Sequence, residues 1–553
     1  MRRITLIFLF VTIYSAPMNF DDFRIGQRGD EYRVWVYLKD KTGSEPIGLS
    51  EKTMLRRERN DLGKSPVWLD LSVSNEYVSM LQETGANVLH KSRWLNAVSV
   101  LATRSELLKI QALPFVQTLR PIPLYRKENL LGSENNNRST ELPNHLDYGH
   151  AQDQIEQINV HLAHEAGYTG VGIRILVMDT GFDLEHVVFD SLNLIAQWDV
   201  INNDNETANQ TDDEENNGQD HHGTIILSVI AGYAPGSLIG PAFDAEYLLA
   251  KTEMVEQEIQ QEEDNYVAGL EWGEQNGADV VSTSLGYLDW YTYDDMDGNT
   301  AVTTNAIDIA VGLGMVCVTA AGNEGSDDWY YIIAPADADS VLAVGAVDAN
   351  DDLAYFSSHG PTSDGRIKPE ICARGVSTWA CSAYDMTGYN NYNGTSLSTP
   401  LVAGAAALVI QSHPEWSAME IRNAMMMTAS QNDEPDNDFG YGILNTWEAI
   451  QYGTTVTVGP SSQLPDIIKI ANAYPNPFNP EISFTVDAPI GLPIQVSVLD
   501  IEGVIVEKIY SGRISYPGFK VYWNAAHYPS GLYLLQTCWL GGGSHVQKVT
   551  FLK

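Results

Sequence analysis

The middle of the chain alternates short, continuously apolar runs with longer segments of helical periodicity. Residues 175–178 and 315–319 have the length and composition of buried strands. Residues 300–313 and 417–428 instead carry apolar side chains at helical spacing. Strands that alternate with helices favour a mostly parallel sheet with helices on both faces. The pattern therefore predicts an α/β unit, which we bound at residues 147–452.

The pattern changes on the amino-terminal side of this unit. Residues 31–122 contain, in order, a strand, a helix, two strands, a helix and a strand. That is the order of a ferredoxin-like α+β unit. The polar residues 126–150, rich in Asn, Glu and Ser, have the composition of an exposed linker. We bound this unit together with its linker at residues 17–146.

On the carboxy-terminal side the pattern is typical of an all-β unit. Residues 454–466 contain Gly, Pro and Ser and predict a linker, which we bound at 453–470. Five short apolar stretches separated by turn residues follow, at residues 482–486, 494–499, 504–510, 532–537 and 546–552. They predict a small antiparallel β-sandwich over residues 471–553.

The first residues have the pattern of a targeting segment. A basic start, Met1-Arg2-Arg3, precedes the mostly apolar residues 4–14 and the small pair Ser15-Ala16. This composition predicts a secretory signal peptide over residues 1–16, which is too short for a comfortable membrane span. No later run of the sequence has the length of a transmembrane helix. We therefore expect export through the periplasm and a protein that is secreted or held at the cell surface.

Composition narrows the classes of function. In 553 residues, 32 Lys and Arg stand against 72 Asp and Glu, and the net charge of −40 argues against nucleic-acid binding, which requires a basic face. Four cysteines are too few for a disulfide framework. Cys372 and Cys381 lie close in sequence, so a bridge between them and two free buried thiols both stay open.

Three motifs place reactive side chains where strands end or helices begin. Asp179 ends the first apolar run, and open α/β sheets carry their sites at this edge. His222 lies in an Asp-His-His-Gly-Thr motif directly before a helical run. Ser396 lies where a glycine-containing turn meets an apolar helix, so it either caps that helix or acts as a nucleophile. The chain order Asp, His, Ser is that of subtilisin and not of chymotrypsin.

Two further motifs follow strands. Asn323 lies in an Ala-Ala-Gly-Asn-Glu-Gly segment, where its side-chain amide is suited to donate to an oxyanion, although the same segment has the composition of a plain turn. Ser284, Leu285 and Gly286 end another strand, where the backbone is suited to pair with an extended peptide.

These motifs, in this order, resemble those of the subtilases, which are subtilisin-like serine endopeptidases. The resemblance implies that Asp179 orients the base, that His222 is the general base and acid, and that Ser396 is the nucleophile. It also implies that Asn323 donates to the oxyanion and that the substrate cleft is lined by Ser284, Leu285, Gly286 and, at the rim of the primary specificity pocket, Glu324. The family pattern His-Gly-Thr selects His222 rather than His221.

The resemblance also implies a biosynthetic history. Subtilases commonly carry an inhibitory propeptide of the kind predicted here, so we expect a zymogen that cuts its own linker and keeps the propeptide as an inhibitor. The other partners would be protein or peptide substrates, cleaved after large apolar residues with tolerance for Lys and Arg. No cofactor is required for the chemistry. The alternative is a non-catalytic surface or binding protein on a subtilase scaffold, against which the intact set of four polar residues argues.

Two acidic stretches raise the question of calcium. Residues 204–220 and the triplet Glu262-Glu263-Asp264 are rich in oxygen ligands, but neither has the spacing of a known calcium loop. A solvated loop insertion is the favoured interpretation of the first, and a helix N-terminus that favours negative charge is an interpretation of the second. Structural calcium stays open, and no metal ligands are assigned.

The last unit resembles the sorting domain of type IX secretion cargo. The likeness rests on Tyr474-Pro475-Asn476-Pro477-Phe478, on Gly531-Leu532-Tyr533 and on the terminal residues 548–553. It implies the type IX secretion machinery as a partner. A generic accessory sandwich that helps to bind substrate is the alternative.

Overall fold

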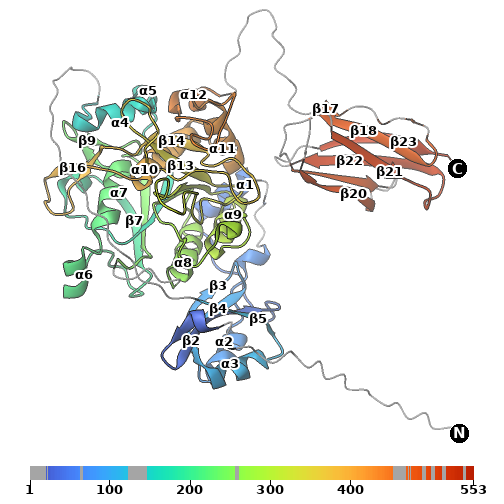
Figure 1. Ribbon diagram of the computed structural model, residues 1–553, viewed down its shortest axis with the longest axis horizontal. Coiled ribbons are helices and arrows are strands. Elements are labelled where there is room, and N and C mark those ends of the chain that lie inside the picture. Colours follow the sequence, from blue (N-terminus) through green and yellow to red (C-terminus); the bar gives the residue numbers. More distant parts are fainter. Residues whose placement is uncertain are drawn as a thin grey trace, which may run out of the picture. The chain divides into compact units, whose positions relative to one another are not determined.

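The computed structural model of the protein contains two compact units, residues 1–454 and 455–553, whose elements are coloured along the chain in Figure 1. The residues that the structure describes are Phe20, 23–60, Leu62, 67–122, 146–255, 261–452, 469–470, Ala473, 475–476, 478–487, 493–499, 505–513, 519–539 and 544–552. The predicted signal peptide, residues 1–16, lies outside them, as do most residues of the two predicted linkers.

A seven-stranded parallel sheet organises the larger unit. Its strands follow the order β14 (Ile371–Arg374), β13 (Leu342–Val347), β12 (Val316–Ala320), β11 (Val280–Thr283), β6 (Arg174–Asp179), β10 (Glu246–Lys251) and β7 (Asn193–Asp199). Because all neighbours are parallel, the carboxyl ends of the strands meet at one edge of the sheet. The strands β6, β12 and β13 are mostly apolar and almost wholly buried, as expected for a parallel sheet that is covered on both faces.

Helices cover this sheet as the apolar pattern predicts. α7 (His221–Ala231) packs with α10 (Thr395–Ser412), while α8 (Gln261–Gln275) packs with α9 (Val302–Gly312). α10 contacts strands β11 to β14 and is, among the described residues, the one helix long and apolar enough to cross a membrane; most of it is buried inside the unit. The other elements are α4 (Gln152–Gln157), α5 (Val160–Glu165), α6 (Asp212–Asn217), α11 (Ala418–Met427), α12 (Thr446–Gln451) and the short strands β8 (Tyr233–Ala234), β9 (Leu238–Ile239), β15 (Thr378–Cys381) and β16 (Tyr389–Tyr392). The predicted α/β class is confirmed.

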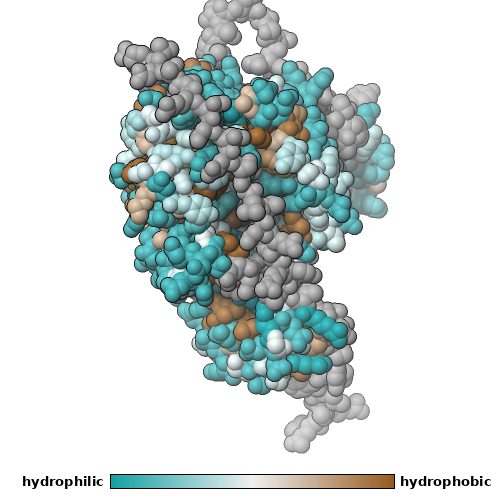
Figure 2. Space-filling model, turned by 60° about the vertical axis from the view of Figure 1, so that its left-hand side comes forward, coloured by the Kyte–Doolittle hydropathy of each residue, from teal (hydrophilic) through white to brown (hydrophobic). Residues whose placement is uncertain are grey.

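The face of the molecule shown in Figure 2 is mostly hydrophilic, in keeping with the acidic composition.

The amino-terminal part of the larger unit has the predicted strand and helix order. β2 (Glu31–Leu38) pairs with β1 (Gln27–Arg28), β4 (Ala97–Thr103) and β5 (Val116–Pro121), and β4 pairs with β3 (Asn87–Ser92). The helices α2 (Asn75–Glu83) and α3 (Arg104–Gln111) supply Leu81, Leu107 and Ile110 to a separate apolar core. Thr103 and Glu106 form a capping box at the start of α3.

A further helix, α1 (Glu51–Arg59), was not among the predicted elements. It joins β2 to α2 and begins at Ser50, whose side chain accepts a hydrogen bond from Thr53 N. The polar face of α1 packs on the end of α8, where Thr53 Oγ1 donates to Glu274 O at 2.8 Å. Arg56 Nε donates to Leu313 O at 3.2 Å, and Arg56 Nη1 donates to Ala278 O. The partial negative charge at the carboxyl ends of α8 and α9 favours an arginine at this position.

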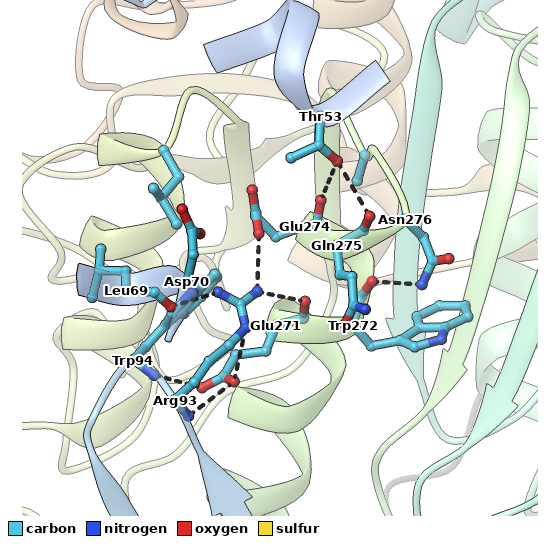
Figure 3. A network of polar contacts seen from close by, with 12 residues as sticks. Thr53, Leu69, Asp70, Arg93, Trp94, Glu271, Trp272, Glu274, Gln275 and Asn276 are labelled. Carbon is cyan, nitrogen blue, oxygen red and sulfur yellow. Dashed lines mark hydrogen bonds and ion pairs between the residues drawn. The ribbon is translucent and has the colours of Figure 1, made fainter. Parts of the chain in front are cut away.

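A buried carboxylate holds this amino-terminal part to α8. Glu274 Oε1 accepts hydrogen bonds from Arg56 Nη2 at 2.6 Å and from Arg57 Nε and Nη2 at 3.0 and 2.9 Å. Its Oε2 accepts from Arg93 Nη2 at 2.9 Å (Figure 3). The Glu274 side chain is fully buried, and Arg57 is in turn held by both oxygens of Asp70. The single carboxylate of Glu274 therefore pairs with three arginines.

A second carboxylate on α8 binds the turn that follows β3. Glu271 accepts from Ser92 Oγ at 2.6 Å. It also accepts from the backbone N–H groups of Arg93 and Trp94 at 3.1 Å (Figure 3). Burial raises the pKa of Glu271, although the guanidinium of Arg93 opposes the shift. Farther along α8, Asp264 Oδ2 accepts from Arg33 Nη2 at 2.8 Å. Charge complementarity thus dominates the polar contacts of this interface.

The carboxy-terminal unit consists of two antiparallel sheets. One has the order β17 (Lys469–Ile470), β18 (Glu481–Asp487) and β21 (Phe519–Asn524); the other has the order β20 (Ile505–Arg513), β19 (Pro493–Leu499), β22 (Gly531–Trp539) and β23 (Ser544–Phe551). Phe484 and Trp523 from the first sheet share one apolar core with Val496 and Leu535 from the second. The predicted β-sandwich is therefore present.

The cysteines of the larger unit are free thiols. Cys372 and Cys381 are both buried and unbridged, so the hypothesis of a bridge between them is wrong. Their sulfurs lie in different surroundings: Cys372 Sγ donates to Phe439 O and Cys381 Sγ donates to Thr224 O. Burial raises the pKa of the Cys381 thiol to about 12, so this thiol stays protonated at neutral pH.

Candidate active site

Asp179 is the last residue of β6 and lies fully buried at the carboxyl edge of the sheet. Its Oδ1 accepts a hydrogen bond from Thr180 N at 2.8 Å and contacts His222 Nδ1 at 2.7 Å. A carboxylate in this position favours the imidazole tautomer whose proton is on Nδ1, and Nε2 is then the basic nitrogen.

His222 is the second residue of α7, and a glycine brings its helix to Asp179. A Cβ at Gly223 would collide with Gly181 O and lie 3.0 Å from the Cβ of Asp179, so only glycine permits the first turn of α7 to approach the end of β6. The His222 side chain is 40 % exposed, which leaves its outer edge accessible. The neighbouring His221 instead packs edge-on against Tyr384, with ring centroids 4.5 Å apart.

Ser396 is the second residue of α10, directly after a turn that contains Gly394. Gly394, with φ 144° and ψ 153°, precedes the helix in a conformation that favours glycine. Ser396 Oγ donates to Ser284 O at 3.3 Å, and Ser284 Oγ donates to Ser396 O at 2.9 Å. Among the described residues, no hydrogen bond joins Ser396 Oγ to His222. Catalytic hydrogen bonds are often long in free enzymes and tighten when substrate binds.

Asn323 follows β12 and is fixed by the residue before the serine. Its Oδ1 accepts from Thr395 N at 2.9 Å and from Thr395 Oγ1 at 3.1 Å. Because the carbonyl end of the amide faces Thr395, the NH₂ end faces away from it. Asn323 Nδ2 makes no hydrogen bond to any residue in the described ranges. A preorganised donor is therefore available beside α10.

The segment expected to line the substrate cleft leaves the sheet at this point. β11 ends at Thr283, so Ser284, Leu285 and Gly286 lie beyond its paired residues, and Ser284 O reaches Ser396. Glu324 follows Asn323, is partly exposed, and donates its backbone N–H to Ser358 Oγ at 3.0 Å. The structure thus brings all eight sequence-predicted site residues to one region.

The two acidic stretches differ in exposure. Most acidic side chains of residues 204–220 are exposed, as expected for a solvated insertion, although residues 212–217 form helix α6. Glu214, on α6, contacts the buried Lys251 Nζ at 2.7 Å, and Lys251 also lies 3.1 Å from Asp199. Glu262, Glu263 and Asp264 are all buried at the start of α8. Within residues that the structure describes, no group of three or more His, Cys, Asp or Glu side chains is placed to hold a metal ion.

Comparison with known proteins gives the following matches. A model of the subtilase family matches residues 170–442, and a model of the Bacteroidota propeptide domain of peptidase family S8 matches residues 33–139. Subtilisin DY of Bacillus licheniformis is 33 % identical over 299 residues, which cover 54 % of this chain and 97 % of that protein. Subtilisin E of Bacillus subtilis (strain 168) is 33 % identical over 316 residues, covering 56 % and 74 %. Subtilisin BL of Lederbergia lenta is 32 % identical over 292 residues, covering 53 % and 95 %.

Proposed function

Because this chain belongs to the subtilase family and is a serine endopeptidase made with a propeptide, we propose that Asp179, His222 and Ser396 are its catalytic triad. The observation that carries the proposal is the 2.7 Å contact between His222 Nδ1 and buried Asp179, at the same sheet edge as Ser396. A second function has no comparable support, since a non-catalytic binding protein has no need of this arrangement.

The proposed reaction follows from the roles of these groups. His222 Nε2 removes the proton of Ser396 as Oγ attacks the carbonyl carbon of a peptide bond. The tetrahedral intermediate collapses to an acyl-enzyme, and His222 gives the proton to the leaving amine. Water then repeats both steps and releases the acid. Asp179 stabilises the imidazolium of His222 that forms during both acylation and deacylation.

Asn323 is the proposed donor to the oxyanion. Its Nδ2 is the group that the Thr395 contacts leave available, and Thr395 is the neighbour of Ser396. A donor held before the reaction stabilises developing charge without reorganisation. No metal or cofactor is needed for these steps. Calcium, if bound, would act on stability and not on the chemistry.

Labelling of the serine tests the proposal most directly. A fluorophosphonate probe should label the chain after the propeptide has been removed, and peptide mapping should place the label on Ser396. The reason is that these probes react with an activated serine and not with a helix-capping one. The same preparation should cleave casein. An unlabelled, folded protein that leaves casein intact would point to the non-catalytic alternative.

We propose that the zymogen processes itself. The propeptide match and the charged interface support an inhibitor that stays bound after cleavage. Mass spectrometry should find a cut between about Pro121 and Tyr148 in the active chain and an intact junction in Ser396→Ala. The same cut in both proteins would mean that another protease makes it.

We also propose export and sorting. The amino-terminal pattern of residues 1–16 supports a signal peptide, and the β-sandwich with its Tyr-Pro-Asn-Pro-Phe opening supports a sorting domain for type IX secretion. The protein would then be secreted or displayed at the cell surface, with the secretion machinery as a partner. The propeptide and substrates are its other proposed partners.

A further inference from the structure

Ile333 lies in the gap between the two segments that flank the reactive serine. Its backbone N–H donates to Ala321 O at 3.2 Å, beyond the end of β12. The next residue, Ala334, exchanges two hydrogen bonds with Tyr287 at 2.8 and 3.2 Å, beyond the end of β11. The backbone at 333–334 is therefore tied to both walls of the gap.

The side chain of Ile333 fills the space between two glycines on those walls. A Cβ at Gly286 would lie 2.7 Å from Ile333 Cγ1 and still closer to Cδ1. A Cβ at Gly322 would lie 3.2 and 3.3 Å from the same two atoms. Glycines with open space beside them commonly let a ligand approach the backbone. Here an isoleucine occupies that space, and it is only 8 % exposed.

This space adjoins the reacting groups. Gly286 ends the segment whose Ser284 O contacts Ser396 Oγ, and Gly322 immediately precedes Asn323. A substrate carbonyl must lie close to both Ser396 Oγ and Asn323 Nδ2 to react. When the peptide extends along 284–286, alternate side chains project to opposite sides. The side chain next to the attacked carbonyl then projects between the two glycines.

From these contacts we infer that Ile333 closes the primary specificity pocket, so that the enzyme cleaves after small residues such as alanine, glycine and serine. The inference rests on the proposed function. A phenylalanine or leucine side chain would overlap Cγ1 and Cδ1 of Ile333 unless that residue moved. Discrimination by a single methylene in a pocket is worth about 10- to 200-fold in kcat/KM. This inference differs from the sequence-based expectation of cleavage after large apolar residues, and the two predict opposite preferences.

Two peptide substrates that differ in one residue test the inference on the processed enzyme. Succinyl-Ala-Ala-Pro-Ala-p-nitroanilide should have a kcat/KM at least about tenfold above that of the Phe analogue. In Ile333→Ala the order should reverse, with the Ala-to-Phe ratio falling by about a hundredfold or more. Ile333→Val, which lacks only Cδ1, should give an intermediate ratio.

A neighbouring residue supplies the matched control. Ile332 packs in the main core of the protease, so Ile332→Val should lower the unfolding temperature and leave the Ala-to-Phe ratio unchanged. The wild-type ratio and a map of casein cleavage sites need no variant, so the inference can be tested even if Ile333→Ala does not fold. A wild-type preference for Phe, or a ratio that Ile333 variants leave unchanged, would overturn it. Failure of wild-type enzyme to cleave either peptide would overturn the proposed function, and this inference with it.

Discussion

Ser396→Ala is expected to abolish peptide hydrolysis while leaving the fold intact. The loss in kcat should approach about a millionfold, which is the magnitude measured in subtilisin, a relative of this chain. The side chain makes one hydrogen bond, to Ser284 O at 3.3 Å, and is partly buried at the start of α10, so its removal leaves the core unchanged. Initial rates on casein and on a peptide anilide, with circular dichroism to check the fold, measure the effect.

Graded variants separate a lost nucleophile from general damage to the site. His222→Ala should be about as severe, and combining it with Ser396→Ala should add little, because the triad acts as a unit. Asn323→Ala should cost less, about a hundred- to thousandfold in kcat, a magnitude also taken from subtilisin. Near-wild-type activity in Ser396→Ala would show that the serine is not the nucleophile.

Glu274→Ala in the mature protease is expected to weaken inhibition by the propeptide strongly. The change removes the carboxylate shared by Arg56, Arg57 and Arg93 and leaves Arg56 buried without a carboxylate partner. Breaking a buried ion pair on one side costs about 3–5 kcal/mol, which corresponds to a rise of roughly a hundredfold or more in Ki. Inhibition titrations with the propeptide released by processing measure this value.

The adjacent Gln275 is the control for that variant. It lies at the same end of α8, and its side chain donates to Gly48 O at 3.1 Å in an exposed, neutral contact. Gln275→Ala should therefore change Ki only a few-fold. Both variants should keep wild-type kcat/KM on a small peptide, since neither side chain contacts the catalytic residues. A change of less than about fivefold in Ki for Glu274→Ala would refute a central role for this carboxylate.

The fold was predictable where each element carries its own apolar signal. β6 and β12 contain short apolar runs, and α11 follows Ser417, its N-cap and the first residue of a capping box. Helix α1 escaped prediction because the face it buries is polar: Thr53, Arg56 and Arg57 resemble an exposed surface until their acidic partners are known. Strand β21 was not predicted, although buried and exposed positions alternate strictly along it. An alternation over only six residues is easily overlooked when the sequence is searched for continuous apolar runs.

The site residues likewise fall into those that the sequence predicts and those that only the fold reveals. The sequence alone identifies four site residues because each lies in a short motif that can be recognised without the fold: Asp179, His222, Asn323 and Ser396. The role inferred for Ile333 depends on three segments that converge from 286, 322 and 333, and nothing local distinguishes it from the adjacent Ile332. Glu262 lies in the first turn of α8, as the interpretation of a helix N-terminus implies, but its burial depends on tertiary packing and carries no local signal.

The interface on α8 also bears on how the free enzyme meets its inhibitor. The propeptide presents arginines, and α8 presents the carboxylates of Asp264, Glu271 and Glu274. Opposite charges of this kind accelerate diffusional encounter, and dissolved salt screens them over about 8 Å at physiological ionic strength. In dilute medium a released propeptide is therefore recaptured rapidly, whereas in brine it is recaptured slowly. Under the proposed secretion and self-processing, the salinity around the cell would set how long each liberated protease molecule stays active.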